Sequence, residues 1–124
     1  MEAQPTNNLT GGQLNAALSR AVVQLHTHYL GRGPTKGHAF HRGNVVVVIL
    51  EDTLTRAERS LIGAGKEEVV RDMRRQLVAT MRRDLVGAVE QLTARRVVSL
   101  LADADVAPDV AAEVFILDRA LAAG

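Results

Sequence analysis

Apolar and polar residues alternate along this chain with two different periods, and each change of period marks the boundary of a predicted element. From Gln13 to Leu30 apolar residues recur every three or four positions, which predicts a helix with one buried face. Gly31 and Pro34 follow, and they predict the end of this helix because glycine adopts the left-handed conformation and proline cannot continue a helix. The apolar positions of the face are Leu14, Leu18, Ala21, Val22, Leu25 and Tyr29.

Two short runs after this helix predict a β-hairpin. The strands are expected from Gly37 to His41 and from Val45 to Glu51, with the turn at Arg42-Gly43-Asn44. The second run is apolar at every position from Val45 to Leu50 rather than at alternate positions. This pattern predicts a strand that is covered on both faces.

A capping box at Thr55 to Glu58 then starts a short helix, which Gly63 and Gly65 end. The next helix is long and extends from Lys66 to Leu92, with acidic residues near its N-terminus. Its expected core stripe is Val70, Met73, Leu77, Met81, Leu85, Ala88 and Leu92.

After Leu92 the pattern returns to strands, expected from Val97 to Leu101 and from Val114 to Leu117. The acidic segment between them, Ala102 to Ala112, is interpreted as a linker. The fold class is therefore α+β, in the order helix, hairpin, two helices, hairpin, with one antiparallel four-stranded sheet packed with helices. Residues 1–12 are expected to be a flexible lead, residues 13–118 a single domain and residues 119–124 a short tail.

Composition narrows the function. The 124 residues contain no cysteine, which excludes disulfides and thiol catalysis. The net charge is +1 and aromatic residues make up 2% of the chain, so a nucleic-acid partner is not expected. No apolar run approaches the roughly 20 residues of a membrane span, and the N-terminus has no signal-peptide core. A cytoplasmic protein without a transmembrane segment is expected.

The segment from Gly31 to Lys36 is a candidate anion site. Its glycines allow backbone N–H groups to converge on an anion, and Arg32 and Lys36 supply positive charge. The alternative, which we favour, is a helix C-cap followed by a turn into the strand. The candidate anion-binding residues are Gly31, Arg32, Gly33, Lys36 and Arg74.

The four histidines do not predict a metal site. His26 and His28 are two positions apart on a helix and diverge, while His38 and His41 are three apart on a strand and point to opposite faces. No metal or other cofactor is expected. The sequence also shows no nucleophile–base pair and no phosphate loop, so no enzymatic activity is expected.

The arginines of the long helix have two interpretations. Arg71, Arg75 and Arg82 share one face, and interleaved acidic residues favour a solvated surface over a binding stripe. Arg74 projects beside the apolar stripe, which favours an ion pair with Glu51 or Glu58.

Four segments together resemble the MpsC-like family of small bacterial and archaeal proteins. They are Gly31–Lys36, Val45–Glu51, Leu54–Leu61 and Glu67–Arg75, and the resemblance extends from about Gln13 to Asp118. The family is named for a sodium-translocating, membrane-potential-generating system. The resemblance implies an accessory to a membrane complex that takes up cations or inorganic carbon. Ala94 departs from the glycine expected after the long helix.

Two functions remain open at this point. The first is a non-enzymatic accessory or regulatory module that docks on a protein partner, which would place it in the cytoplasm or peripherally at the inner face of the membrane. The alternative is a sensor of a small anion or nucleotide that uses the Gly31–Lys36 turn with His38, Arg42 or Arg74.

The expected sheet also predicts self-association. If the long and short helices cover one face and the first helix covers part of the other, an aliphatic patch stays exposed. A two-fold homodimer is the simplest way to bury such a patch.

Overall fold

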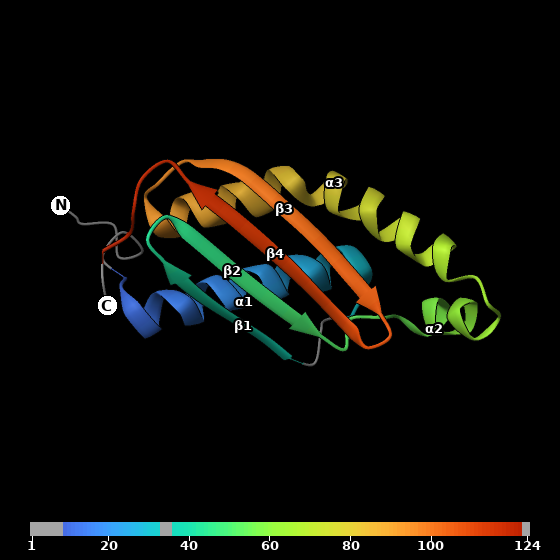
Figure 1. The fold of residues 1–124 in the computed structure, drawn as a ribbon. Helices are drawn as coiled ribbons and strands as arrows, with labels where there is room; N and C mark the ends of the chain where they lie inside the picture. The colour runs from blue at the N-terminus through green and yellow to red at the C-terminus, as the bar shows by residue number, and fades with distance from the viewer. Residues whose placement is uncertain (1–8, 33–35, 123–124) are drawn as a thin grey trace.

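In the computed structural model, which describes residues 9–32 and 36–122, a layer of helices packs on a four-stranded antiparallel sheet (Figure 1). The predicted α+β class and the order of the elements are confirmed. The elements are α1 (Gly11–Leu30), β1 (Lys36–Arg42), β2 (Val45–Glu51), α2 (Arg56–Gly63), α3 (Glu67–Thr93), β3 (Val97–Val106) and β4 (Asp109–Leu117).

The strand order across the sheet is β1-β2-β4-β3, so the last strand of the chain lies in the middle of the sheet. The pairing of β2 with β4 joins the two hairpins, with Val47 opposite Val114. The central strands are the more apolar ones. The charged residues of the edge strands β1 and β3 are exposed, because an edge strand leaves its side chains accessible to water, whereas Glu113 of the central strand β4 is buried.

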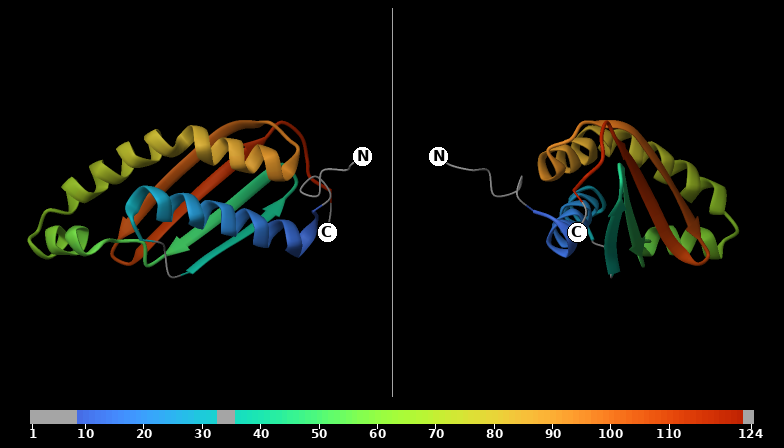
Figure 2. Two further views of the ribbon diagram at one scale, coloured as in Figure 1. Left: turned by 180° about the vertical axis from the view of Figure 1, so that it is seen from behind. Right: turned by 60° about the vertical axis from the view of Figure 1, so that its left-hand side comes forward.

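Both long helices lie on the same face of the sheet (Figure 2). α1 contacts β1 and α3, while α3 contacts β3. The expectation that α1 covers part of the opposite face is wrong. Two helices side by side, each about 10 Å wide, match a sheet about 19 Å across, so one face takes both of them.

None of the helices in the described residues covers the other face of the sheet. Burial along β2 alternates, with Val46, Val48 and Leu50 buried under the helices and the residues between them only partly buried. The prediction that β2 is covered on both faces is thus wrong for the single chain. Its continuous apolar run supplies one face to the core and one face to the surface.

The core lies between the helices and the sheet, with Phe115 of β4 fully buried. On α3 the buried row differs from the predicted stripe, because Met73 is exposed and Val89 is buried. The buried positions of α3 recur mainly every four residues. Four residues are slightly more than one helical turn, so the buried row winds slowly around the helix. The predicted stripe, with mixed steps of three and four residues, stays on one side. The buried apolar residues of the main cluster are Leu14, Leu18, Val22, Val46, Val48, Leu50, Met81, Leu85, Val89, Leu100, Ala111, Phe115 and Leu117.

The predicted acidic linker is mostly strand. β3 continues to Val106 and β4 begins at Asp109, so only two residues connect them. Asp103 and Asp105 are exposed at alternate positions of β3. The interpretation as a linker was wrong because aspartates are accommodated where a strand presents them to water.

The ends of the two long helices use the left-handed conformation. Gly31 has φ 82°, and its N–H donates to the carbonyl oxygen of Thr27, which confirms the predicted C-cap. At the end of α3, Ala94 has φ 56° and its N–H donates to the carbonyl of Glu90. The residue that departs from the expected glycine therefore adopts a conformation that disfavours a Cβ atom.

Replacing Gly31 by alanine is expected to lower the free energy of unfolding by about 1 kcal/mol. A Cβ atom there meets no other atom within 4 Å, so the cost comes from the backbone alone. Gly63→Ala is the control, because Gly63 ends α2 with equally open space and without a positive φ. Ala94→Gly should change stability in the opposite direction. Thermal melts in which Gly31→Ala matches the wild type would contradict the C-cap.

Candidate functional site

The Gly31–Lys36 turn lies partly outside the described residues, since Gly33, Pro34 and Thr35 are not described. Arg32 already donates hydrogen bonds to two backbone carbonyls, those of Asp52 at 3.2 Å and Leu54 at 2.6 Å. Lys36 is exposed at the start of β1. In the described part of this candidate site, the arginine therefore serves to hold the segment that follows β2.

Arg74 makes the ion pair expected of it. Its guanidinium binds Glu58 in a bidentate manner, with Nε 2.6 Å from Oε2 and Nη2 2.7 Å from Oε1. It also donates to the hydroxyl and the carbonyl of Thr53. Arg74 is only 7% exposed, so its hydrogen-bonding groups are directed at protein oxygens rather than at solvent.

The capping box at the start of α2 is part of the same network. Thr55 accepts from the N–H of Glu58, and the Glu58 carboxylate accepts from the N–H of Thr55. Burial by itself raises the pKa of Glu58, but the hydrogen bonds from Arg74 and Thr55 outweigh it and lower that pKa below its usual value. Glu58 is consequently held as a carboxylate inside the fold.

A third residue, Asp109, completes the attachment of the segment from Asp52 to Leu54. Its carboxylate accepts from the N–H and the hydroxyl of Thr53 and from the N–H of Leu54, at 3.0 to 3.1 Å. Arg32 and Arg74 bind the carbonyls of this segment while Asp109 binds its N–H groups. These side chains therefore hold the segment from Asp52 to Leu54 in place, which is a structural role.

The arginine stripe on α3 is only partly a solvated face. Arg71 and Arg82 donate to the carbonyls of Ala104 and Leu100, which lie on the edge strand β3. The interpretation as a face with local acidic partners holds for Arg71, which lies within 4 Å of Glu67 and Glu68. Both arginines also reach the neighbouring strand, so the face is not entirely solvated. Arg75 is exposed and forms no hydrogen bond or ion pair with the residues that the structure describes.

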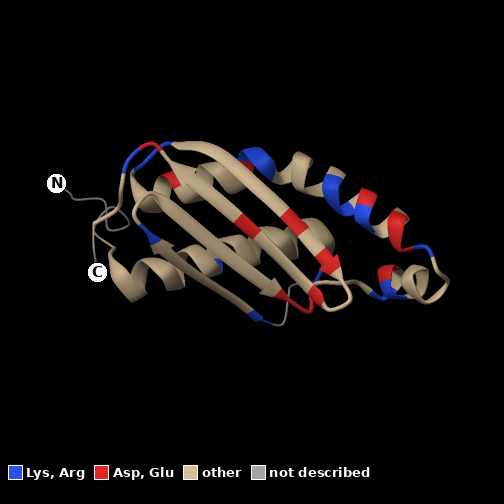
Figure 3. Ribbon diagram, viewed as in Figure 1, with Lys and Arg blue, Asp and Glu red and all other residues tan. Residues whose placement is uncertain are grey.

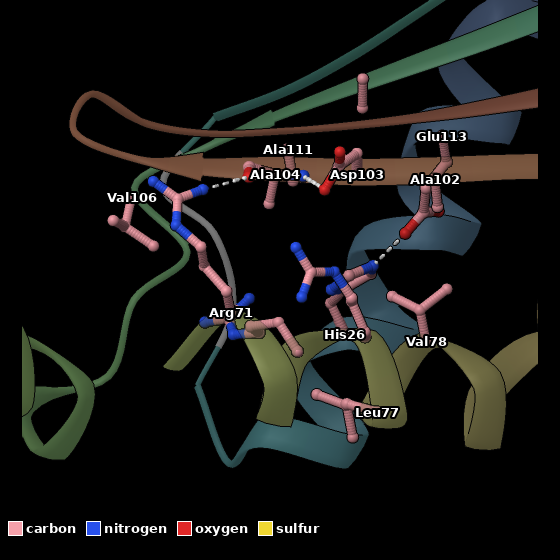
Figure 4. Close-up of a pocket in the computed structure, with 13 residues that line it drawn as sticks. His26, Arg71, Leu77, Val78, Ala102, Asp103, Ala104, Val106, Ala111 and Glu113 are labelled. Carbon is pink, nitrogen blue, oxygen red and sulfur yellow. Dashed lines mark hydrogen bonds and ion pairs between the residues drawn. The ribbon is translucent and has the colours of Figure 1, made fainter. Parts of the chain in front are cut away.

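A pocket of about 120 Å³ lies between α3 and the β3–β4 hairpin (Figure 4). Arg75 is one of its lining residues. The deep part of the pocket holds a buried pair, His26 of α1 and Glu113 of β4, with Nε2 2.7 Å from Oε2. His26 Nδ1 and Glu113 Oε1 are buried without a hydrogen-bond partner among the described residues. The lining residues are His26, Arg71, Arg74, Arg75, Leu77, Val78, Ala102, Asp103, Ala104, Val106, Ala111, Ala112 and Glu113.

Sequence reasoning considered His26 only as a metal ligand and did not single out Glu113. One signal was available for the histidine, since His26 follows Leu18 and Val22 at four-residue steps on the buried face of α1. Glu113 gave a weaker signal, as one acidic residue within an apolar strand. The pair itself joins residues 87 positions apart, which only the packing of α1 on β4 brings together.

The outer face of the sheet is a second candidate site, because it presents an apolar row that none of the described helices covers. We call this surface the open face. Across its middle, cross-strand pairing aligns Phe40, Val47, Val114 and Leu101. Phe40 and Leu101 are 49% and 60% exposed, which is far above the exposure of core residues.

The two edges of the open face carry opposite charges (Figure 3). The β1 edge presents Lys36, His38 and Arg42, all exposed. The β3 edge presents Asp103 and Asp105, also exposed. The pairing aligns His38 with Asp103 across the sheet through Ile49 and Ala112.

These features define a two-layer α+β domain with one open apolar face and one pocket between its layers. None of the helices in the described ranges is long and apolar enough to cross a membrane. The chain belongs to the family described as "Na+-translocating membrane potential-generating system (MpsC)", whose model matches residues 10–119. The resemblance found in the sequence is thereby confirmed. No curated protein and no solved structure matches the chain.

Proposed function

We propose that this chain is a non-enzymatic accessory module of a sodium-translocating membrane system and that it works as a homodimer joined through its open face. The family supports the association with such a system. The single observation that supports a docking role is the open face, an apolar sheet surface that no helix of the described chain covers. Soluble monomers rarely expose a continuous apolar patch of this kind.

The size of the open face fits a second copy of the chain. Four strands are about 19 Å across, and seven paired residues are about 23 Å long. Each copy therefore contributes on the order of 450 Å² of projected area, and two copies together approach the lower limit of specific interfaces.

The charged edges select how the two copies face each other. Two identical sheets can stack with a two-fold axis that lies between them and runs parallel to the strands. This axis places the β1 edge of one copy over the β3 edge of its partner. Lys36 of each copy then faces Asp105 of the other, so that unlike charges meet on both sides of the axis, and His38 faces Asp103.

The competing two-fold axis is perpendicular to the strands and is disfavoured by the same charges. It would place β1 over β1, which brings Lys36 of one copy towards Arg42 of the other. It would also leave the acidic β3 edges facing each other. Like charges in close apposition at an interface are costly, so the parallel axis is favoured.

The association with a membrane system is tested by purifying the tagged chain from its native membranes and identifying the membrane-spanning proteins in the eluate. We expect a multi-span subunit of an ion-translocating complex in a fixed ratio to the tagged chain. A variant with Val114→Asp on the open face reports whether dimerisation is needed for this binding. Recovery of the chain without any membrane-spanning protein would contradict the accessory role.

A further inference from the structure

We propose that the pocket between α3 and the β3–β4 hairpin binds a small hydroxylated organic monocarboxylate. Most of the pocket lining lies on the helix-covered side of the sheet, and Asp103 belongs both to this lining and to the acidic edge of the open face. The proposal retains the idea of an anion sensor that the sequence raised, but it assigns the anion to different residues.

The arginines of the pocket specify the charge of the ligand. Arg74 is neutralised by Glu58, and Arg71 lies within 4 Å of carboxylate oxygens of Glu67, Glu68 and Asp105. Arg75 has no such partner among the described residues. Asp103 also lines the pocket, and its carboxylate accepts a hydrogen bond from the N–H of Ala104. The Arg75 guanidinium can pair with one carboxylate group of a ligand, because the planar fork of arginine matches a carboxylate.

The middle of the pocket specifies an apolar body. Leu77 and Val78 line it from α3, and the alanines of β3 and β4 line the opposite wall. The alanine side chains are what leaves the space open between the helix and the sheet. The volume of about 120 Å³ is close to that of an apolar cavity of about 150 Å³ that binds benzene. The pocket therefore has room for a body about the size of a six-membered ring.

The deep end of the pocket specifies a hydroxyl group. Glu113 Oε1 and His26 Nδ1 are buried without hydrogen-bond partners among the described residues, and an unsatisfied buried polar atom is unfavourable. A hydroxyl group of a ligand can donate a hydrogen bond to Glu113 Oε1. The ligand class follows from the three parts together: a carboxylate at Arg75, an apolar body and a hydroxyl towards the buried pair.

Three probes that each contain one benzene ring separate the contribution of the carboxylate from that of the hydroxyl. They are 4-hydroxybenzoate, benzoate and phenol, with binding measured by titration calorimetry and by NMR shifts of the Val78 and Leu77 methyl groups. We expect 4-hydroxybenzoate to bind at least about tenfold more tightly than either single-group probe, because each polar end contributes about one hydrogen bond to a charged group.

Arg75→Ala and Arg83→Ala form a matched pair of variants, since both remove one positive charge from α3 but only Arg75 lines the pocket. Arg75→Ala should weaken 4-hydroxybenzoate about tenfold and leave phenol unchanged, while Arg83→Ala should bind all three probes as the wild type does. Equal binding by the two variants would overturn the role of Arg75. Absence of binding by every probe up to about 10 mM would mean that the pocket holds only water and would overturn the proposal. Light scattering on the same samples reports dimerisation separately.

Discussion

Replacing Arg74 by alanine is expected to lower the free energy of unfolding by about 3–5 kcal/mol, the largest stability effect that we expect from one substitution on α3. The cause is Glu58, which is 3% exposed and would stay buried without its cation. Thr53 would also lose two hydrogen bonds from the guanidinium. Urea denaturation of both proteins measures the difference.

Arg75→Ala is the matched control, because Arg75 is the next residue of the same helix and is exposed. We expect it to change the free energy of unfolding by less than about 0.5 kcal/mol. A double variant with Arg74→Met and Glu58→Leu should recover much of the loss, since it removes both buried charges together. If Arg74→Ala were as stable as Arg75→Ala, the buried pair would not support the fold.

The pH dependence of stability checks the same pair. Because the pKa of Glu58 is lowered in the folded state, its contribution to stability is present above the unfolded value of about 4.3 and is lost as pH falls through the folded pKa. Denaturation between pH 7 and pH 3 should show this loss in the wild type. In Glu58→Gln the corresponding part of the acid sensitivity should be absent.

Val114→Asp is expected to raise the dissociation constant of the homodimer by more than about 100-fold, because the two-fold axis buries the new carboxylate twice in an apolar interface. Val114 lies at the centre of the open face, opposite Val47 of its own sheet. Light scattering across a dilution series measures the change. Val69→Asp is the control, since Val69 is 53% exposed on α3 and lies away from the open face.

Charge reversal tests the proposed axis. His38→Glu should weaken self-association because it places two carboxylates opposite one another across the dimer. Asp103→Lys should weaken it because it removes the carboxylate that faces His38. Mixing the two variants should restore association as a heterodimer, in which Glu at position 38 faces Lys at position 103 and the native His38 faces the native Asp103. A wild-type protein that stays monomeric at high micromolar concentration would contradict the dimer, and a mixture that stays weak would contradict the axis.

The sequence by itself determined the elements and their local ends. The helical period, the capping box at Thr55 and Glu58 and the C-cap at Gly31 all depend on residues a few positions apart, and the structure has each of them. The pairing of Arg74 with Glu58 was also accessible, because the helical wheel placed an arginine beside the core with Glu58 as one of two candidate partners.

Only the tertiary structure decided which face of the sheet receives the helices. A run such as Val45 to Leu50 is compatible with cover on both faces, and the choice depends on α1 and α3 packing side by side across the whole sheet. The insertion of β4 beside β2 likewise decides that Glu113 meets His26 and that Asp109 binds the segment after β2. Periodicity records which side of an element is apolar, whereas contacts between distant elements depend on the free energy of packing all of them together.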